Sequence, residues 1–192
     1  LLNIVINLLY KEGEIQMYKI NFSKPINVHF MGIGGISMSG LAKILLDRHF
    51  TVSGSDAHIS DLTTELQQDG CIISYPQSAD NITGDIDLVV YTAAIHPDNP
   101  ELKAAVDAGI PTLTRAELLG QIMKNYHTAV NVAGTHGKTT TTSMITEILL
   151  AADADPTISV GGILNSIGGN IRVGRLSLIH ISEPTRRSYI SY

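Results

Sequence analysis

The stretch INVHFMGIGGISMSG, from Ile26 to Gly40, sets the fold class. An apolar run, Ile26–Met31, enters the glycine loop Gly32–Gly35 and continues into apolar residues at helical spacing. A strand, a glycine turn and a helix in this order favour a nucleotide-binding α/β unit. In such a unit the first glycine permits the tight turn and the second lets a diphosphate approach the backbone. Ser37 stands at the third position, where glycine is commoner, so a tight βα turn of any doubly wound fold is the alternative.

Strands and helices alternate after this stretch. We expect strands at Phe50–Asp56, Cys71–Tyr75, Asp87–Thr92 and Ile110–Leu113, and helices at Asp61–Asp69, Glu101–Ala108 and Arg115–Tyr126. The alternation predicts an α/β fold with a Rossmann-like, doubly wound parallel sheet. Ligands of such sheets bind at the carboxyl ends of the strands, which here include the loop that begins at Thr92. Asp56 lies at the distance expected for a ribose contact, or it caps the next helix, with Ser55 or Ser60 sharing that role.

A second phosphate-type loop occurs in VNVAGTHGKTTTT, residues Val130–Thr142. An apolar strand enters a glycine-bounded turn, and a helix-like segment, Met144–Leu150, follows. Such a turn points backbone N–H groups inward, and the helix N-terminus adds positive potential. Lys138 is suited to the outer phosphates of a nucleotide and the Thr139 hydroxyl to Mg²⁺. Only two residues separate the glycines of the turn, fewer than in the usual motif, so a turn that starts a helix with Thr135 as its cap is the alternative.

Composition narrows the function classes. The chain has 192 residues and a formal net charge of −5, which argues against a nucleic-acid-binding surface. Its single cysteine, Cys71, excludes an intrachain disulfide and suits a reducing, cytoplasmic setting. The apolar run Leu1–Tyr10 is too short to span a bilayer, so we expect no membrane segment there.

Both ends of the sequence look foreign to the fold. Residues 1–16 are interpreted as a translated leader, with Met17 as the true start, because Lys11-Glu12-Gly13 can be encoded by a ribosome-binding sequence. Leu176–Arg186 resembles a translated sequencing adapter, so residues 176–192 are interpreted as a non-native tail. The expected organisation is therefore a Rossmann-like domain over residues 17–126, followed over 127–175 by the beginning of a P-loop ATPase-type α/β domain, truncated here.

Two phosphate-type loops in one chain form a pattern that resembles the Mur ligases. The matching segments are His29–Gly40, Val52–Asp56, Asp98–Glu101, Pro111–Glu117, Ala133–Met144, Gly161–Asn165 and Gly169-Asn170. The resemblance implies an ATP-dependent ligase of peptidoglycan precursor synthesis that joins L-alanine to the lactyl carboxylate of UDP-N-acetylmuramate through an acyl phosphate. It implies ATP and Mg²⁺ as cofactors and no nucleic-acid or membrane partner.

The resemblance also assigns residues to the two sites. ATP is expected on Gly134, Thr135, His136, Gly137, Lys138, Thr139 and Thr140, with Lys138 on the phosphates and Thr139 on Mg²⁺. The UDP-sugar is expected on Gly32, Ile33, Gly34, Gly35, Ser37, Ser55, Asp56, Thr92, Ala93, Arg115 and Asn165. Asn165 and Asn170 are expected in a glycine-rich loop that faces the muramyl group. Alternatives remain for several of these side chains: His136 can shape its turn, Arg115 can be an exposed residue of a helix start, and Asn165 and Asn170 can be turn residues.

The family pattern continues beyond this sequence with further magnesium ligands and a C-terminal domain. We therefore expect UDP-sugar binding without ligase turnover from these residues alone. The alternatives are a murein-peptide recycling ligase, a nicotinamide-dependent dehydrogenase built on the first loop, and a non-catalytic nucleotide-binding module.

Overall fold

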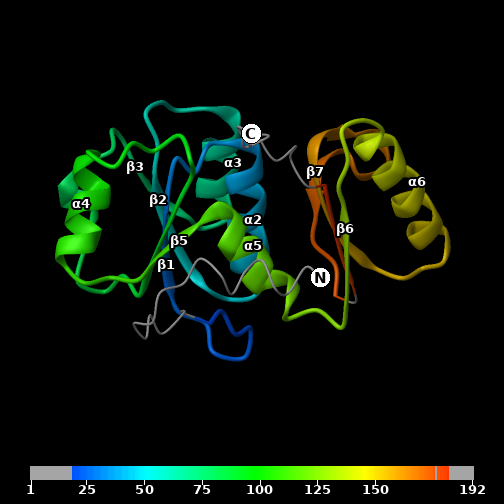
Figure 1. Cartoon of the computed structure of the whole chain (residues 1–192), viewed down its shortest axis with the longest axis horizontal. Helices are drawn as coiled ribbons and strands as arrows, with labels where there is room; N and C mark the ends of the chain where they lie inside the picture. Colours follow the sequence, from blue (N-terminus) through cyan, green and yellow to red (C-terminus); the bar gives the residue numbers. More distant parts are fainter. Residues whose placement is uncertain (1–18, 176, 182–192) are drawn as a thin grey trace, which may run out of the picture.

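The computed structural model describes residues 19–175 and 177–181, which form two sheets with their helices (Figure 1). The first sheet is parallel throughout and has the strand order β3-β2-β1-β4-β5. Its strands are β1 (Asn27–Met31), β2 (Thr51–Ser55), β3 (Ile72–Ser74), β4 (Leu88–Tyr91) and β5 (Thr112–Thr114). Its helices are α2 (Ile36–Asp47), α3 (Asp61–Gln68), η1 (Ala79–Asn81), α4 (Pro100–Asp107) and α5 (Arg115–Met123). The prediction of a doubly wound parallel α/β fold is confirmed.

Polar side chains fix where the helices of this sheet begin. Ser60, one of the predicted alternatives, caps α3 by accepting a hydrogen bond from the Thr63 amide. Asn99 caps α4 by accepting from the amide of Glu101, and Pro100 occupies the first turn of that helix. These caps place the loops that precede the helices at the carboxyl ends of the strands.

The two faces of the first sheet differ in character. Figure 1 shows α2, α3 and α5 on one face and α4 on the other. The first face holds the main apolar core, in which Phe30, Leu41 and Leu118 are fully buried. The α4 face has a smaller apolar cluster around Met31 and Val89, and His29 and Glu101 are buried in addition. The larger core therefore supports α2, the helix that follows the glycine loop.

The second sheet has the order β6-β9-β7-β8. Its elements are β6 (Thr128–Val132), α6 (Lys138–Ala151), β7 (Pro156–Leu164), η2 (Asn165–Ile167), β8 (Gly169–Arg172) and β9 (Ser177–Ile181). Strand β9 pairs in parallel with both β6 and β7, whereas β7 and β8 are antiparallel. Strand β9 lies in the segment that we interpreted as a non-native tail, and its presence does not test that origin. The expected leader, residues 1–16, lies outside the described residues.

The glycine-rich segment after residue 160 differs from the expectation of a loop. Strand β7 runs through Gly161 and Gly162 to Leu164, and only η2 separates it from β8. Asn165 therefore lies in a tight turn, whereas Asn170 lies within β8. Glycine content suggested a loop here, but antiparallel pairing of β7 with β8 satisfies the backbone groups of this segment.

Helix α2 also packs against the second sheet, so it lies between the two sheets (Figure 1). A Cβ atom on Gly40 would lie 3.1 Å from Ile171 Cδ1, so α2 approaches β8 closely. The Arg48 guanidinium lies over the rings of Phe22 and Tyr126 and donates a hydrogen bond to the Gly174 carbonyl at 2.8 Å. These contacts dock the second unit against the helix that begins at the glycine loop.

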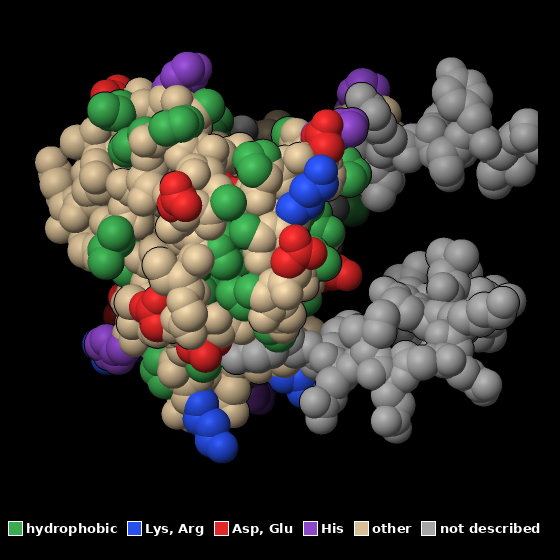
Figure 2. Space-filling model, turned by 90° about the vertical axis from the view of Figure 1, so that its left-hand side faces the viewer, with side chains coloured by type: hydrophobic (Ala, Val, Ile, Leu, Met, Phe, Trp, Pro, Cys, Tyr) green, Lys and Arg blue, Asp and Glu red, His purple; other side chains and the backbone are tan. Residues whose placement is uncertain are grey.

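On the face of the molecule in Figure 2, acidic side chains are scattered among neutral ones and the few Lys and Arg side chains lie apart from one another. Within residues 19–175 and 177–181, no helix combines the length and apolar character needed to cross a membrane.

Candidate functional site

The end of β2 holds the glycine loop through its amide groups. Gly32 has φ +76°, a left-handed conformation that suits glycine, so its predicted role in the tight turn is supported. The amides of Gly32 and Ile33 donate to the Ser55 carbonyl at 2.8 and 3.0 Å. The Gly34 amide donates to Asp56 Oδ2 at 2.8 Å. The first three amides of the loop are therefore bonded within the protein.

The carboxylate of Asp56 is engaged with backbone on both oxygens. Oδ2 accepts from Gly34, and Oδ1 accepts from the Ala57 amide at 2.7 Å. Capping of α3 falls to Ser60 instead, so the alternative role of Asp56 as the helix cap is wrong. The contact of Asp56 with a ribose stays a prediction. In the structure, its carboxylate connects the glycine loop to the end of β2.

A cavity of about 460 Å³ opens next to this loop. Its walls come from the start of α2, from the loop after β4 and from the start of α5; the lining residues are Gly35, Ile36, Ser37, Met38, Thr92, Ala93, Ala94 and Arg115. The amide of Ser39 donates to the Gly35 carbonyl at 2.8 Å as the first bond of the helix. The amides of residues 36–38 therefore have no partner within α2, and the helix N-terminus directs positive potential toward an anion.

Arg115 brings a cation to the same cavity. Its Nη1 atom donates to Ser37 Oγ at 3.0 Å, which joins the start of α5 to the start of α2. A reciprocal cap, in which Thr114 and Glu117 bond each other's backbone amides, fixes the first turn of α5. The guanidinium and the N-terminus of α2 together suit a diphosphate.

The cavity brings together part of the predicted UDP-sugar set. Gly35, Ser37, Thr92, Ala93 and Arg115 line it. The other predicted residues lie elsewhere: Gly32 and Gly34 form the loop behind the cavity, and Ile33 is fully buried in the core. Asn165 is exposed in η2, whereas Asn170 donates from Nδ2 to the Ile36 carbonyl at 3.1 Å, beside the cavity wall.

We did not predict the buried polar contacts of Ser55. Ser55 is 0% exposed, and its hydroxyl donates to Glu101 Oε2 at 2.7 Å. His29 Nε2 lies 2.8 Å from Glu101 Oε1, so this histidine belongs to the same buried group. The available signal was Asn99-Pro100-Glu101 after a strand, which places a carboxylate at a helix start.

The second phosphate-type loop is exposed between β6 and α6. Gly137 has φ +76° and stands at the N-cap of α6, and no side chain of the described residues caps this helix. The alternative of Thr135 as a cap is therefore wrong. The Thr141 amide donates to the Gly137 carbonyl at 2.9 Å, so the amides of residues 138–140 precede the first helical bond. An uncapped N-terminus of this kind fits a phosphate group.

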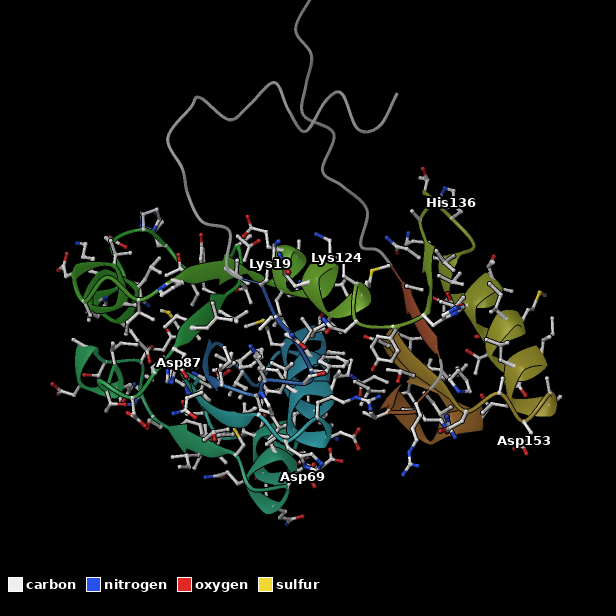
Figure 3. The ribbon with its side chains drawn as sticks, turned by 90° about the horizontal axis from the view of Figure 1, so that it is seen from below. Lys19, Asp69, Asp87, Lys124, His136 and Asp153 are labelled. Atoms are coloured by element: carbon white, nitrogen blue, oxygen red, sulfur yellow. The ribbon has the colours of Figure 1, made fainter. Side chains whose placement is uncertain are left out.

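The side chains of this loop differ in how they lie. Lys138 Nζ donates to the Gly134 carbonyl at 2.6 Å, so the lysine bends back over its own turn. Figure 3 shows His136 projecting outward from the tip of the loop, and it is exposed, as are Thr135, Thr139 and Thr140. In the described part of the chain, no group of three or more His, Cys, Asp or Glu side chains has the arrangement to hold a metal ion. The Mg²⁺ contact of Thr139 stays a prediction.

Comparisons with known proteins match most of this chain to ligases. The model of the Mur ligase family, catalytic domain, matches residues 27–127. UDP-N-acetylmuramate–L-alanine ligase of Lachnospira eligens is 77% identical over 158 residues, which are 82% of this chain and 34% of that protein. The chain thus spans about a third of the length of the curated relatives it matches.

Two solved structures share the fold. The crystal structure of UDP-N-acetylmuramate–alanine ligase from Thermotoga maritima aligns with a TM-score of 0.75 and 35% identity, covering 81% of this chain and 36% of that one. The crystal structure of UDP-N-acetylmuramate:L-alanyl-gamma-D-glutamyl-meso-diaminopimelate ligase from Neisseria meningitides aligns with a TM-score of 0.75 and 27% identity. It covers 83% of this chain and 53% of its own.

Proposed function

This chain belongs to the Mur ligase family, and on that premise we propose that it supplies the UDP-sugar-binding unit of a ligase that joins L-alanine to UDP-N-acetylmuramate. The observation that carries the proposal is the cavity formed by the start of α2, Thr92–Ala94 and Arg115. It combines a guanidinium with a helix N-terminus whose first amides have no partner within α2, and both groups can recognise a diphosphate. The 77% identity to an L-alanine ligase favours that acceptor.

We further propose that the loop Gly134–Thr140 binds ATP as the second substrate. The amides at the start of α6 and the Lys138 ammonium group are positioned to receive the phosphates, once Lys138 leaves the Gly134 carbonyl. Bound Mg²⁺, with Thr139 as one ligand, would neutralise charge that spreads over the transferred phosphoryl group.

The proposed reaction has two steps. A lactyl carboxylate oxygen of the muramyl group forms a bond to the γ-phosphorus of ATP, and the bond to the β-γ bridging oxygen breaks, which releases ADP. The amine of L-alanine then attacks the acyl carbon, loses a proton, and the C–O bond to phosphate breaks, which gives an amide and inorganic phosphate. The residues described here serve mainly to position the two phosphorylated substrates.

Calorimetry with the 192-residue chain tests the first unit. We expect weak binding of UDP-N-acetylmuramate and no phosphate release with ATP and L-alanine. In a full-length protein that carries this sequence, Lys138→Ala should abolish turnover but leave UDP-sugar affinity within about twofold, because the two loops lie on separate sheets. Equal loss of turnover and UDP-sugar binding would contradict the assignment of the two sites.

A murein-peptide ligase is the second candidate, since the Neisseria meningitides enzyme aligns as closely in fold as the Thermotoga maritima one. Comparing L-alanine with the tripeptide as acceptor in the full-length protein decides between them. We also propose a cytoplasmic location, where ATP and UDP-linked precursors are available.

A further inference from the structure

The α4 side of the first sheet contains a group of polar side chains, of which three are buried and two are partly exposed. It consists of His29, Ser53, Ser55, Asn81 and Glu101, and we call it the Glu101 network. Glu101, Ser55 and His29 are 0%, 0% and 2% exposed. None of the atoms of this network lines the cavity, so it has no direct contact with a ligand there.

Three donors meet at the Glu101 carboxylate. Oε1 lies 2.8 Å from His29 Nε2 and 3.2 Å from Asn81 Nδ2, and Oε2 accepts from Ser55 Oγ at 2.7 Å. A buried carboxylate without such partners would be strongly destabilising. An apolar side chain at this position would cover the sheet with a smaller desolvation penalty. A carboxylate here therefore implies a task besides packing.

The network reaches the glycine loop through one residue, Ser55. The Ser55 hydroxyl bonds Glu101, and its carbonyl accepts the amides of Gly32 and Ile33. Ser55 is thus bonded through its hydroxyl to a buried carboxylate and through its carbonyl to the glycine loop. At the other end, Ser53 Oγ lies 2.9 Å from His29 Nδ1, and no hydrogen bond joins its hydroxyl to the loop within the described residues.

We propose that Glu101 is a positioning residue for the UDP-sugar site. It fixes Ser55, which fixes the amides of Gly32 and Ile33 and thereby the point at which α2 begins. The inference rests on the proposed function, because the start of α2 is the wall of the cavity assigned to the diphosphate. Its structural part, the control of the loop by Glu101, holds whether or not that ligand binds.

Serine-to-alanine changes at the two ends of the network provide a matched test. Ser55→Ala removes the link to the loop, whereas Ser53→Ala removes a hydroxyl from the same strand and network but leaves that link intact. Glu101→Leu removes the acceptor of the Ser55 hydroxyl and leaves no side-chain group at that position that can replace it. Thermal unfolding followed by circular dichroism identifies variants that fold, and the two serine variants keep the test decisive if Glu101→Leu does not.

The first measurement needs no ligand. Hydrogen exchange of the Gly32 and Ile33 amides, followed by NMR in the 192-residue chain, reports the loop directly. We expect exchange about tenfold faster in Ser55→Ala and Glu101→Leu, since one hydrogen bond is worth about that factor, and no more than about twofold faster in Ser53→Ala. The double variant Ser55→Ala/Glu101→Leu should match the larger single effect, because both changes remove the same hydrogen bond.

The second measurement is UDP-N-acetylmuramate affinity by calorimetry, with an expected loss of about three- to tenfold in Ser55→Ala and Glu101→Leu and little loss in Ser53→Ala. If all three changes speed exchange equally, the network contributes only to the general stability of the fold, and the inference is overturned. Unchanged exchange at Gly32 and Ile33 in the Ser55 and Glu101 variants would do the same. If exchange responds as expected but the unsubstituted chain does not bind the UDP-sugar, the proposed function fails and the positioning role of Glu101 stands.

Discussion

Adjacent glycines of the first loop should respond in opposite ways to an added methyl group. A Cβ atom on Gly34 would lie 2.9 Å from both Asp56 Oδ2 and Thr63 Cγ2. A Cβ atom on Gly35 would come no nearer than 3.5 Å to the Gly32 carbonyl, and Gly35 has φ −66°, which alanine adopts readily. Gly34→Ala and Gly35→Ala are therefore the same change in two different surroundings.

The expected free energies of unfolding follow from these contacts. At Gly34, overpacking costs about 1–3 kcal/mol, and displacement of Asp56 weakens its bond to the Gly34 amide by about 1 kcal/mol more, since that carboxylate is only half-buried. We expect Gly34→Ala to lose about 2–4 kcal/mol. At Gly35 the methyl group restricts mainly the unfolded chain, so stability should stay equal or rise by up to about 1 kcal/mol.

Urea denaturation followed by far-ultraviolet circular dichroism measures this difference, with equal m-values as the check that both variants unfold alike. Gly35 lines the cavity and Gly34 does not, so calorimetry should show weaker UDP-sugar binding in the stable Gly35→Ala variant. The reasoning is refuted if the two variants have stabilities within about 0.5 kcal/mol of each other, or if Gly35→Ala is the less stable.

Three further changes test other parts of the structure. Ser37→Ala should weaken UDP-sugar binding about three- to tenfold by calorimetry. In an Arg115→Ala background the same change should have little effect, because the Ser37 hydroxyl acts by accepting a hydrogen bond from Arg115. Additive losses in the double variant would contradict this. Gly137→Ala should destabilise the start of α6 by about 1–2 kcal/mol, since its φ of +76° is strained for alanine, and should weaken ATP binding in a full-length protein; unchanged urea unfolding would be the contrary result. Burial raises the pKa of the Cys71 thiol from 9.0 to about 12, so above pH 9 the thiol ionises in the unfolded chain before it does so in the folded one. The free energy of unfolding should therefore fall as pH rises from about 9 toward 12, and Cys71→Ala should remove the part of the fall that comes from this thiol. A thiol reagent that modifies the native protein rapidly at pH 8 would show that the thiol is not buried.

Much of the first sheet could be predicted because its signals are local. The apolar run before Gly32 and the cap at Ser60 each depend on a few neighbouring residues, and the structure has β1 and α3 at the expected places. Helix α6 begins at Lys138, earlier than the predicted segment Met144–Leu150. The prediction missed the start of the helix because four threonines follow Lys138 there. Threonine has low helix propensity, so apolar spacing alone detected only the later part.

The role of Ser55 could not be read from local pattern. A serine at the end of a strand beside a glycine loop suggests a ligand contact, but its hydroxyl turns to Glu101, a residue on a helix far along the sequence. The hydrogen bond between Ser55 and Glu101 forms only because the fold brings the end of β2 next to the start of α4. The meeting of Ser37 with Arg115 has the same origin, since it joins two helix starts at neighbouring strand ends.

The strand order of the two sheets has a consequence for synthesis on the ribosome. Every strand of the first sheet has been translated once Thr114 is made, so that unit can form its pairings while later residues are still being added. Strand β6 is different, because among the described strands it pairs with β9 alone. In this chain β6 therefore has no partner among the described strands until Ser177–Ile181 has emerged, so the first sheet should form before the second. Because Ser177–Ile181 lies in the segment that we interpreted as a non-native tail, this order is expected of the 192-residue chain alone.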